Sequence, residues 1–526
     1  MKKISALIFA LCLAPFGNNF ADELGFDPLN ISKNLPEKIS PTNINLQRSF
    51  LQQSKEINAN NNKNNNKNNN NFDFCNSNNN NLNNLKLQNL DALDVIDITL
   101  CNNPKTKELW ATTLYQATNV GVAKSAYFPT ISASIDGSKS YSKQRQIRNR
   151  GENRSGRLNF SWLVYDFGGR EAKIDQANYL LQAAIYSQNA TVQSLILNSL
   201  TAFYNVKAKQ ALVISTKEAE LTAAESFNAA KTKYEVGVTT PADVLQAQTA
   251  HSQSVLNHIK AVGDFKIAIS NLLNAIGIPL PETSESLNNL ISPFDAKNLQ
   301  QTYTHKQLQT IKQEISTALE NRPDLLALKQ QIEASKESLK IIKTQFLPSI
   351  NLSGNYNKQY NKSKTNSSEI YYDSEKEVYV YSNGSNVHYW SNSNSLTLSI
   401  SIPIFSGFST YYQQKAAEQQ IQQNIAKYQT LKSSISNDIW VAYENLHTAF
   451  QSIRTTNDLL TSARKSHEMA LGRYKSGVGT LIDVLNAQSA LASAKQQKIQ
   501  AFLDWQTSKA KVAYALGNLD YTILEK

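Results

Sequence analysis

The sequence predicts a mainly α-helical protein with a smaller β-sheet part, built from two copies of one unit. Three observations lead to this prediction. Two proline-free segments, 169–234 and 408–474, are rich in Ala, Gln, Lys, Glu and Leu, which favour helices. Short runs before each segment alternate apolar and polar side chains, as strands do. The stretch KYEVGVTTPADVLQAQ at 233–248 returns as RYKSGVGTLIDVLNAQ at 473–488.

The two copies keep a constant offset of 240 residues. Nine of the sixteen positions in the repeated stretch are identical, which indicates a duplication rather than chance. The same offset joins Leu158 to Leu398 and Gly277 to Gly517, so the register holds over about 120 residues without a gap. We predict a first repeat at 88–277, an inter-repeat segment at 278–317, a second repeat at 318–517 and a C-terminal tail at 518–526.

The N-terminus is typical of a bacterial export signal. A short basic start is followed by an apolar stretch, Ile4–Ala14, and by a plausible cleavage point after Ala21. We predict a signal peptide at 1–21 that is removed in the mature protein. Cys12 raises the alternative of a lipoprotein, although Leu11 stands where a lipidation motif requires a small residue.

Residues 22–87 form an N-terminal extension with an asparagine-rich tract. Asparagine occupies 18 of the 27 positions from 58 to 84, so the tract cannot bury enough apolar surface to order itself. We predict a disordered insertion. Two cysteines remain in the mature chain, Cys75 and Cys101, and an oxidising periplasm favours a disulfide between them. Two unpaired buried thiols are the alternative.

Each repeat is expected to follow the same order of elements. A helical segment comes first, at about 88–127 and again at 318–346. Two strands follow: the run Leu396–Ile404 alternates apolar residues with mainly Ser and Thr, and Leu158–Tyr165 alternates less cleanly. A polar, Tyr-rich stretch at 368–390 in the second repeat is expected to be an enlarged loop. The long helix, a turn and a helix of about 35 residues complete each repeat.

These elements do not fit a compact globular core. Beyond the signal, the sequence has no run of about 18 apolar residues, so no membrane-spanning helix is expected. Four strands cannot close a transmembrane barrel alone, but three chains supply twelve. Each long helix would extend over roughly 100 Å and is too polar for lipid. We therefore predict a trimer with a 12-stranded membrane β-barrel and a periplasmic α-helical tube.

The doubled YxxGxxxxxDVLxAQ motif and the paired strand starts FPTISAS and LPSINLS resemble the TolC family of trimeric outer-membrane efflux and secretion channels. The resemblance covers about residues 88–520, and the asparagine-rich tract departs from it. It implies a homotrimer whose barrel lies in the lipid of the bacterial outer membrane and whose helical tunnel lies in the periplasm. It also implies a periplasmic adaptor (membrane fusion) protein and an inner-membrane pump of RND, ABC or MFS type as partners.

The repeated motif ends each long helix and predicts a hairpin tip. Glycine permits the backbone reversal, and threonine can cap the helix that follows. The resemblance implies that these turns dock the adaptor. The predicted docking residues are Val236, Gly237, Val238 and Thr240 in the first tip and Gly477, Val478 and Thr480 in the second. Turn formation alone is the alternative role for the glycines and threonines.

The resemblance also implies a gate close to the tips. In the family, the residue matching Asp483 lies at the constriction, Tyr474 matches a gate tyrosine, and Asp243 matches a gate carboxylate on the neighbouring hairpin. Carboxylates that converge on an axis repel one another, and cations or protons would relax them. Asn486, a further ring position, stands where the type member has aspartate, and Gly479 stands where it has arginine. These departures predict a gate with fewer charged residues. A dipole-favoured early-helix position is the alternative for Asp243.

Composition and motifs argue against several function classes. The net charge is +11, but Lys and Arg are spread along the chain, which argues against nucleic-acid binding. The sequence has no nucleophile elbow, phosphate loop or HExxH motif, so we expect no enzyme, cofactor or metal site. We expect a passive exit duct for small toxic compounds in a tripartite export system. An outlet for type I protein secretion and, from a different class, a structural or adhesive surface stalk are the alternatives.

Overall fold

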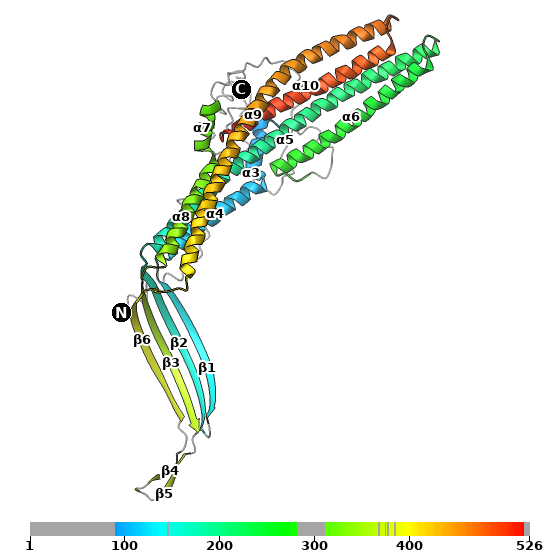
Figure 1. Ribbon diagram of the computed structural model, residues 1–526. Helices are drawn as coiled ribbons and strands as arrows, with labels where there is room; N and C mark the ends of the chain where they lie inside the picture. Colours follow the sequence, from blue (N-terminus) through cyan, green and yellow to red (C-terminus); the bar gives the residue numbers. More distant parts are fainter. Residues whose placement is uncertain are drawn as a thin grey trace, which may run out of the picture. The chain divides into compact units, whose positions relative to one another are not determined.

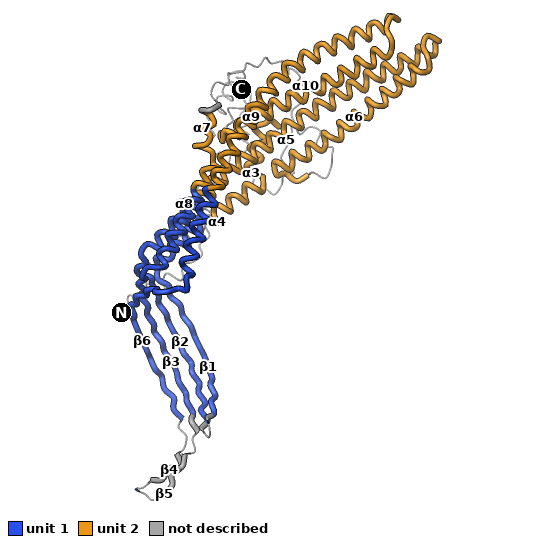
Figure 2. Tube along the Cα trace, viewed as in Figure 1, with its two compact units in different colours: residues 1–35, 115–181, 330–425 blue, residues 36–114, 182–329, 426–526 orange. Residues whose placement is uncertain are grey.

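The computed structural model describes residues 90–144, 147–280, 311–366, 369–373, 375, 378–382 and 386–519. The predicted signal peptide, the asparagine-rich tract and Cys75 lie outside these residues. The chain divides into two compact units (Figure 2). Unit 1 contains residues 115–181 and 330–425, and unit 2 contains the other described residues.

Both repeats contain two short helices, two long strands, a 67-residue helix and a shorter helix, in that order (Figure 1). The helices of the first repeat are α3 (Ala92–Asn102), α4 (Pro104–Ser125), α5 (Gly169–Glu235) and α6 (Pro241–Ile276). Those of the second are α7 (Ile311–Asn321), α8 (Pro323–Thr344), α9 (Ser409–Lys475) and α10 (Leu481–Ala515). Because α5 and α9 have equal length and the predicted offset, the expected long helices are confirmed. No helix within the described ranges is long and apolar enough to cross a membrane.

The segment expected to be helical at 88–127 is helical, but it contains two helices rather than one. The structure has α3 and α4 there, separated by Asn103, whose backbone is extended. The break occurs because Pro104 has no N–H to donate and disfavours helical backbone in the residue before it. The second repeat breaks in the same way at Arg322, which precedes Pro323. Its first helix, α7, also begins before the predicted start at 318.

The four long strands form one antiparallel sheet in the order β1-β2-β3-β6 (Figure 1). Their bounds are β1 (Thr130–Gln144), β2 (Ile147–Tyr165), β3 (Ser349–Asn366) and β6 (Asn386–Ser401), and β4 (Glu369–Asp373) pairs separately with β5 (Val378–Ser382). The strands are longer than predicted because their outer parts lack the alternation of apolar and polar residues that marks a strand in the sequence. The stretch 368–390 is therefore not only a loop. β6 stops before Ile404, since Pro403 cannot donate to a strand neighbour.

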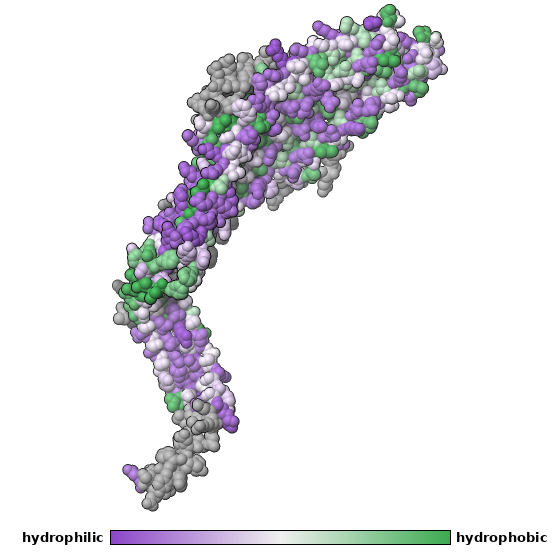
Figure 3. Space-filling view, in the orientation of Figure 1, coloured by the Kyte–Doolittle hydropathy of each residue, from purple (hydrophilic) through white to green (hydrophobic). Residues whose placement is uncertain are grey.

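The two faces of this sheet differ in chemistry. One cross-strand row contains Ile131, Phe160, Gly354 and Leu396. The adjacent row contains Ser132, Asn159, Asn355 and Ser395. Successive residues of a strand point to opposite faces, so the first row belongs to an apolar face and the second to a polar face. Figure 3 shows apolar side chains gathered where the strands of unit 1 join its helices.

The core of unit 2 forms where helix ends meet. Leu272, Leu273 and Ile276 of α6 pack against Val95 and Ile98 of α3. All five side chains are almost completely buried. A buried aliphatic side chain stabilises a fold by about 1.5–3 kcal/mol. This cluster therefore holds the end of the first repeat against its beginning.

Gly277 allows this contact to be close. It ends α6 with left-handed backbone (φ 77°), and a Cβ atom there would lie 2.6 Å from Asn103 Cα. Asn103 Nδ2 donates a hydrogen bond of 2.8 Å to the Ala275 carbonyl, one of the unpaired carbonyls at the helix end. Gly517 and Arg322 repeat the arrangement, since Arg322 Nη1 donates to a carbonyl at the end of α10 at 2.9 Å. The breaks before Pro104 and Pro323 thus receive the ends of α6 and α10.

Candidate functional site

Both hairpin tips are built by the same backbone turn. Gly237 follows α5 with left-handed backbone, and its N–H donates to the Tyr234 carbonyl at 2.9 Å. Val238 N–H donates to the Lys233 carbonyl at 2.8 Å. This pair of bonds is the Schellman arrangement that commonly ends a helix at glycine. Gly477 makes the corresponding bonds after α9, so the repeated motif forms two equivalent tips.

A threonine and an aspartate begin the helix after each tip. Asp483 N–H donates to Thr480 Oγ1 at 3.2 Å, and Thr480 N–H donates to Asp483 Oδ2 at 3.3 Å. This reciprocal capping box satisfies two backbone donors at the start of α10. At the start of α6, Thr240 donates to Asp243 Oδ2 from its N–H at 3.4 Å and from its hydroxyl at 3.2 Å. Both aspartates therefore contribute to the turn itself.

The tips differ at the residue before the capping threonine. In the first tip, the Thr239 hydroxyl also donates to Asp243 Oδ2. In the second, Gly479 stands at this position, and a Cβ there would lie 3.0 Å from Arg473 Cβ. Asp243 is consequently half-buried under three hydrogen bonds, whereas Asp483 is exposed. The carboxylate that is more available to an external cation is therefore that of Asp483.

Hydrogen bonds keep both carboxylates ionised. The Thr239 hydroxyl is the main cause of a lowered pKa at Asp243, and Thr240 lowers that pKa further. The pKa of Asp483 is lowered first by Thr480 and then by the charge on Arg473. Hydrogen bonds and cations favour the charged form of a carboxyl group. Each tip therefore carries an ionised aspartate at neutral pH.

Tyr474 joins the two hairpins of the chain. It is 8% exposed, whereas its counterpart in the first repeat, Tyr234, is 46% exposed. Tyr474 packs in a buried cluster with Ala230, Ala247, Leu481 and Val484. Burial, and then the charge on Asp243, raises the pKa of Tyr474, so its hydroxyl stays neutral at physiological pH. Equal positions in the two repeats thus have unequal environments.

Lys233 provides a polar contact at the same place, and sequence analysis does not identify it. Its Nζ atom lies 3.7 Å from the centre of the Tyr474 ring and donates to the Tyr474 carbonyl at 3.0 Å. The available signal is a basic residue at the same motif position in both copies, Lys233 and Arg473. Because Tyr474 is 241 positions away, only packing of one hairpin on the other brings them together.

Both tips expose valine side chains. Val236, Val238 and Val478 are 68%, 73% and 74% exposed. Asn486 is exposed on α10, three residues after Asp483, so both lie on one face of that helix. The predicted docking valines are therefore in solvent, and the two predicted constriction residues of the second tip lie together.

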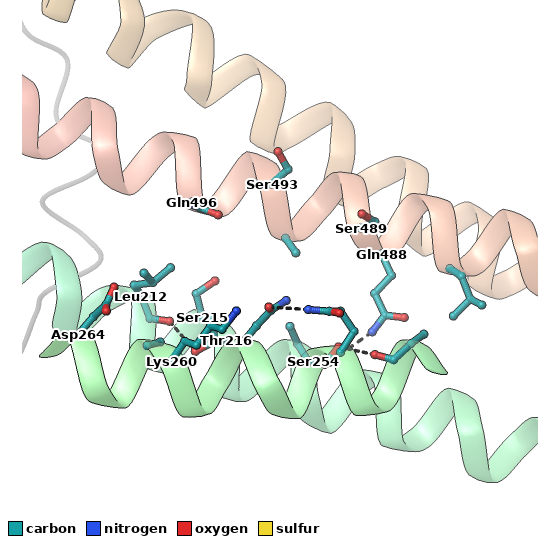
Figure 4. Close-up of a pocket in the computed structure, with 17 residues that line it drawn as sticks. Leu212, Ser215, Thr216, Ser254, Lys260, Asp264, Gln488, Ser489, Ser493 and Gln496 are labelled. Carbon is teal, nitrogen blue, oxygen red and sulfur yellow. Dashed lines mark hydrogen bonds between the residues drawn. The ribbon is translucent and has the colours of Figure 1, made fainter. Parts of the chain in front are cut away.

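A groove of about 510 Å³ lies between α5, α6 and α10 (Figure 4). Its lining includes Ser215, Thr216, Ser254, Asn257, Gln488 and Ser489. Gln488 extends from α10 toward the first hairpin and donates to the Ala219 carbonyl at 3.4 Å. Lys495 and Glu218 form an ion pair of 2.5 Å between the same helices. The lining also contains Leu212, Leu485 and several alanines, so the groove is amphipathic.

The described residues include one cysteine, Cys101, and no cluster of metal ligands. In the part of the chain that the structure describes, no group of three or more His, Cys, Asp or Glu side chains could hold a metal ion. Cys101 lies in α3 and is disulfide-bonded. Its pairing with Cys75 stays a prediction, since Cys75 lies outside the described residues.

Comparison with known proteins gives one consistent result. A family model described as outer membrane efflux protein matches residues 95–278 and 315–518. Protein CyaE of Bordetella pertussis is 25% identical over 446 residues, which cover 84% of this chain and 86% of CyaE. Outer membrane protein TolC of Escherichia coli is 23% identical over 332 residues, which cover 62% of each chain.

A solved structure shows the same fold. The outer membrane protein VceC of Vibrio cholerae superposes with a TM-score of 0.65 and 17% identity, over 82% of this chain and 97% of VceC. The predicted TolC-like fold is therefore confirmed. The family model covers most of both repeats, including both tips. The chain thus belongs to the outer membrane efflux protein family, whose TolC-like members are outer-membrane channels and not enzymes.

Proposed function

We propose that this chain is the exit channel of a tripartite export system and that it passes small toxic compounds through the outer membrane. TolC-family channels are trimeric and work with an adaptor and an inner-membrane pump. The observation that carries the proposal is the sheet with two different faces. An apolar face suits lipid, and a face of Ser and Asn suits a water-filled passage.

Three copies of the sheet would complete the membrane part. β1 and β6 are its two edges, and an open edge in lipid leaves backbone N–H and C=O groups without partners. Joining β1 of one copy to β6 of the next in a threefold ring removes every edge. Transport through this passage is passive, and the partner pump supplies the energy.

The tips serve as the adaptor-docking surface in this proposal. Val236, Val238 and Val478 are exposed on turns that are rigidly defined by the Schellman bonds. Exposed apolar side chains on a rigid turn favour binding to a partner over remaining in water. Asp483 and Asn486 form the constriction, while Asp243 and Tyr474 stabilise the closed arrangement from inside the protomer.

Two experiments test the function. Purified protein in planar lipid bilayers should form ion-conducting channels, and a stalk protein without a passage would form none. A deletion strain should then be grown on a panel of toxic compounds and its secreted proteins compared with those of the parent. Hypersensitivity with a normal secretome supports efflux of small compounds. Loss of a secreted protein with unchanged sensitivity would instead assign the channel to type I secretion.

The docking role has its own test. Val238→Asp and Val478→Asp place charges on the docking surface, so efflux should fall while trimers remain intact. The matched changes Val238→Thr and Val478→Thr keep shape and neutrality and should preserve efflux. Normal efflux with both aspartates in place would remove the tips from the docking surface.

A further inference from the structure

The distal part of the sheet carries an unusual concentration of basic side chains on one face. β-strand register continues the apolar face outward from Ile135, Leu158 and Tyr356. Beyond these residues the same face carries eight exposed Lys or Arg side chains. They are Lys139, Lys143, Arg148, Arg150, Arg154, Lys358, Lys362 and Lys364. We call this set the basic belt.

The other face of the same rows lacks this charge. It presents Ser, Asn and Gln, and its described charged residues are Asp136 and Arg157, which lie 3.9 Å apart as an ion pair. If these basic side chains served only solubility, we would expect them on both faces of the sheet, since successive residues of a strand point to opposite faces. The basic side chains are instead restricted to the face that continues the apolar surface.

The belt contains more charge than its own residues neutralise. The described carboxylate on this face of the rows is Glu152, which pairs with Arg154 at 2.6 Å. Arg150 lies directly opposite Lys364 in the strand register, and Lys143 lies directly opposite Arg148. Like charges at directly opposed positions destabilise a sheet. Two such pairs favour binding of anions from outside the sheet, because anions would reduce the repulsion.

Aromatic side chains mark the same level of the sheet. Trp390 contacts Tyr360, with ring centroids 5.1 Å apart, and the Lys358 ammonium lies 5.3 Å from the Trp390 ring. Arg150 lies over the Tyr141 ring at 5.8 Å. Amphipathic rings concentrate at membrane interfaces, where one part is in lipid and the other in water. The basic belt therefore begins where the apolar surface ends.

We propose that the basic belt binds the phosphate groups of phosphorylated lipid headgroups in the outer leaflet. The apolar surface lies below, and the aromatic rings and basic side chains lie together above it, which matches the order of acyl chains and phosphate-bearing interface in such a lipid. Arg and Lys are the residues that bind phosphate oxygens most strongly. The inference rests on the membrane placement given under Proposed function and adds a lipid partner to it.

The test measures binding of a phosphorylated lipid by the full-length trimer in detergent. Bisphosphorylated lipid A is titrated while trimer thermal stability is followed, with fully dephosphorylated lipid A as the comparison. A basic residue at an anionic surface contributes binding equivalent to about fivefold, so Arg150→Gln with Lys364→Gln should weaken binding roughly 20-fold. Arg157→Gln removes a charge from the same strand on the polar face and should leave binding within about twofold of the parent.

The outcomes separate the possible occupants of the belt. Removing the Arg150–Lys364 pair should leave trimer stability without lipid unchanged or higher, because like-charge repulsion is relieved. A lower stability would mean that the belt is neutralised within the protein, for example by the acidic segment 369–377, and would overturn the proposal. Equal binding of dephosphorylated lipid, or equal stabilisation by inorganic phosphate, would also overturn it.

Failure of this inference can be distinguished from failure of the proposed function. Each variant is also placed in planar bilayers. Channels of parental conductance without any preference for phosphorylated lipid refute the belt alone. Absence of channels from the parent protein refutes the membrane placement on which both rest.

Discussion

Lys233 is the residue whose replacement most directly tests how the two hairpins are held together. Its Nζ atom is 3.7 Å from the Tyr474 ring centre and 3.0 Å from the Tyr474 carbonyl. A cation–π contact contributes about 0.5–2 kcal/mol, and a charged hydrogen bond contributes about 1.5–3 kcal/mol. Because Lys233 is only half-buried, solvent screening reduces their sum, and we expect about 1–2 kcal/mol for the contact.

Replacing Lys233 with methionine keeps the length of the side chain and removes both interactions. If the packed hairpins correspond to the closed channel, a loss of about 1.4 kcal/mol shifts the balance toward the open state about tenfold. Single-channel recording in planar bilayers should show this as a higher open probability at unchanged full conductance. Lys231→Met removes an equal charge from an exposed position two residues away and should leave gating unchanged.

A double-mutant cycle identifies the partner. Tyr474→Leu should open the channel as well, and adding Lys233→Met to it should have little further effect, because both changes remove the same contact. Fully additive effects would show that Lys233 does not act through Tyr474. Equal open probabilities for Lys233→Met and Lys231→Met would refute the reasoning altogether.

Further predictions concern the helix ends and the carboxylates. Gly277→Ala should destabilise the protein by about 2–4 kcal/mol, since it combines left-handed backbone strain with a steric clash, whereas Gly237→Ala has open space and should cost about 1 kcal/mol. Equal thermal shifts for the two variants would contradict this. Asp483→Asn should reduce block of the channel by divalent cations, and an unchanged cation titration would remove Asp483 from the constriction. Thr239→Val should raise the pKa of Asp243, measured by its NMR titration. The pKa values of Asp243 and Asp483 are lowered, so these carboxylates stabilise the tips fully above the ordinary pKa of 3.8. The stabilisation is lost only as the pH falls through the lowered pKa values. Conductance should therefore be constant between about pH 5 and 8.

Local chemistry made the tips predictable from sequence. Gly237, Gly477 and the threonines that follow them act within a few residues of chain, so a turn can be read directly from the motif. The helix break at Asn103 is equally local, because Pro104 follows it directly in the sequence. Such features need no knowledge of distant contacts.

The strands show where a local pattern becomes insufficient. An apolar alternation revealed Leu396, Leu398 and Ile400, but β6 begins at Asn386, and its first ten residues show no such alternation. Those residues join the sheet because their backbone groups form hydrogen bonds with β3. This pairing depends on the register between the two strands, which the sequence of one strand does not specify. The same register separates Arg150 from Arg157 by face, so the basic belt was invisible in the sequence, where its residues are simply dispersed.

The duplication itself explains why the two tips should not have equal roles. Identical backbone turns preserve the hairpins, yet Tyr474 is buried where Tyr234 is exposed, and Asp243 is held by Thr239 where Asp483 faces solvent. In a threefold assembly of two-tip chains, the tips alternate, so neighbouring hairpins are chemically different surfaces. Lys233 holds the second hairpin to the first through Tyr474, and the second hairpin also carries the exposed carboxylate of Asp483. In the proposed gate, opening separates unlike hairpins, a selectivity that a ring of six identical tips would lack.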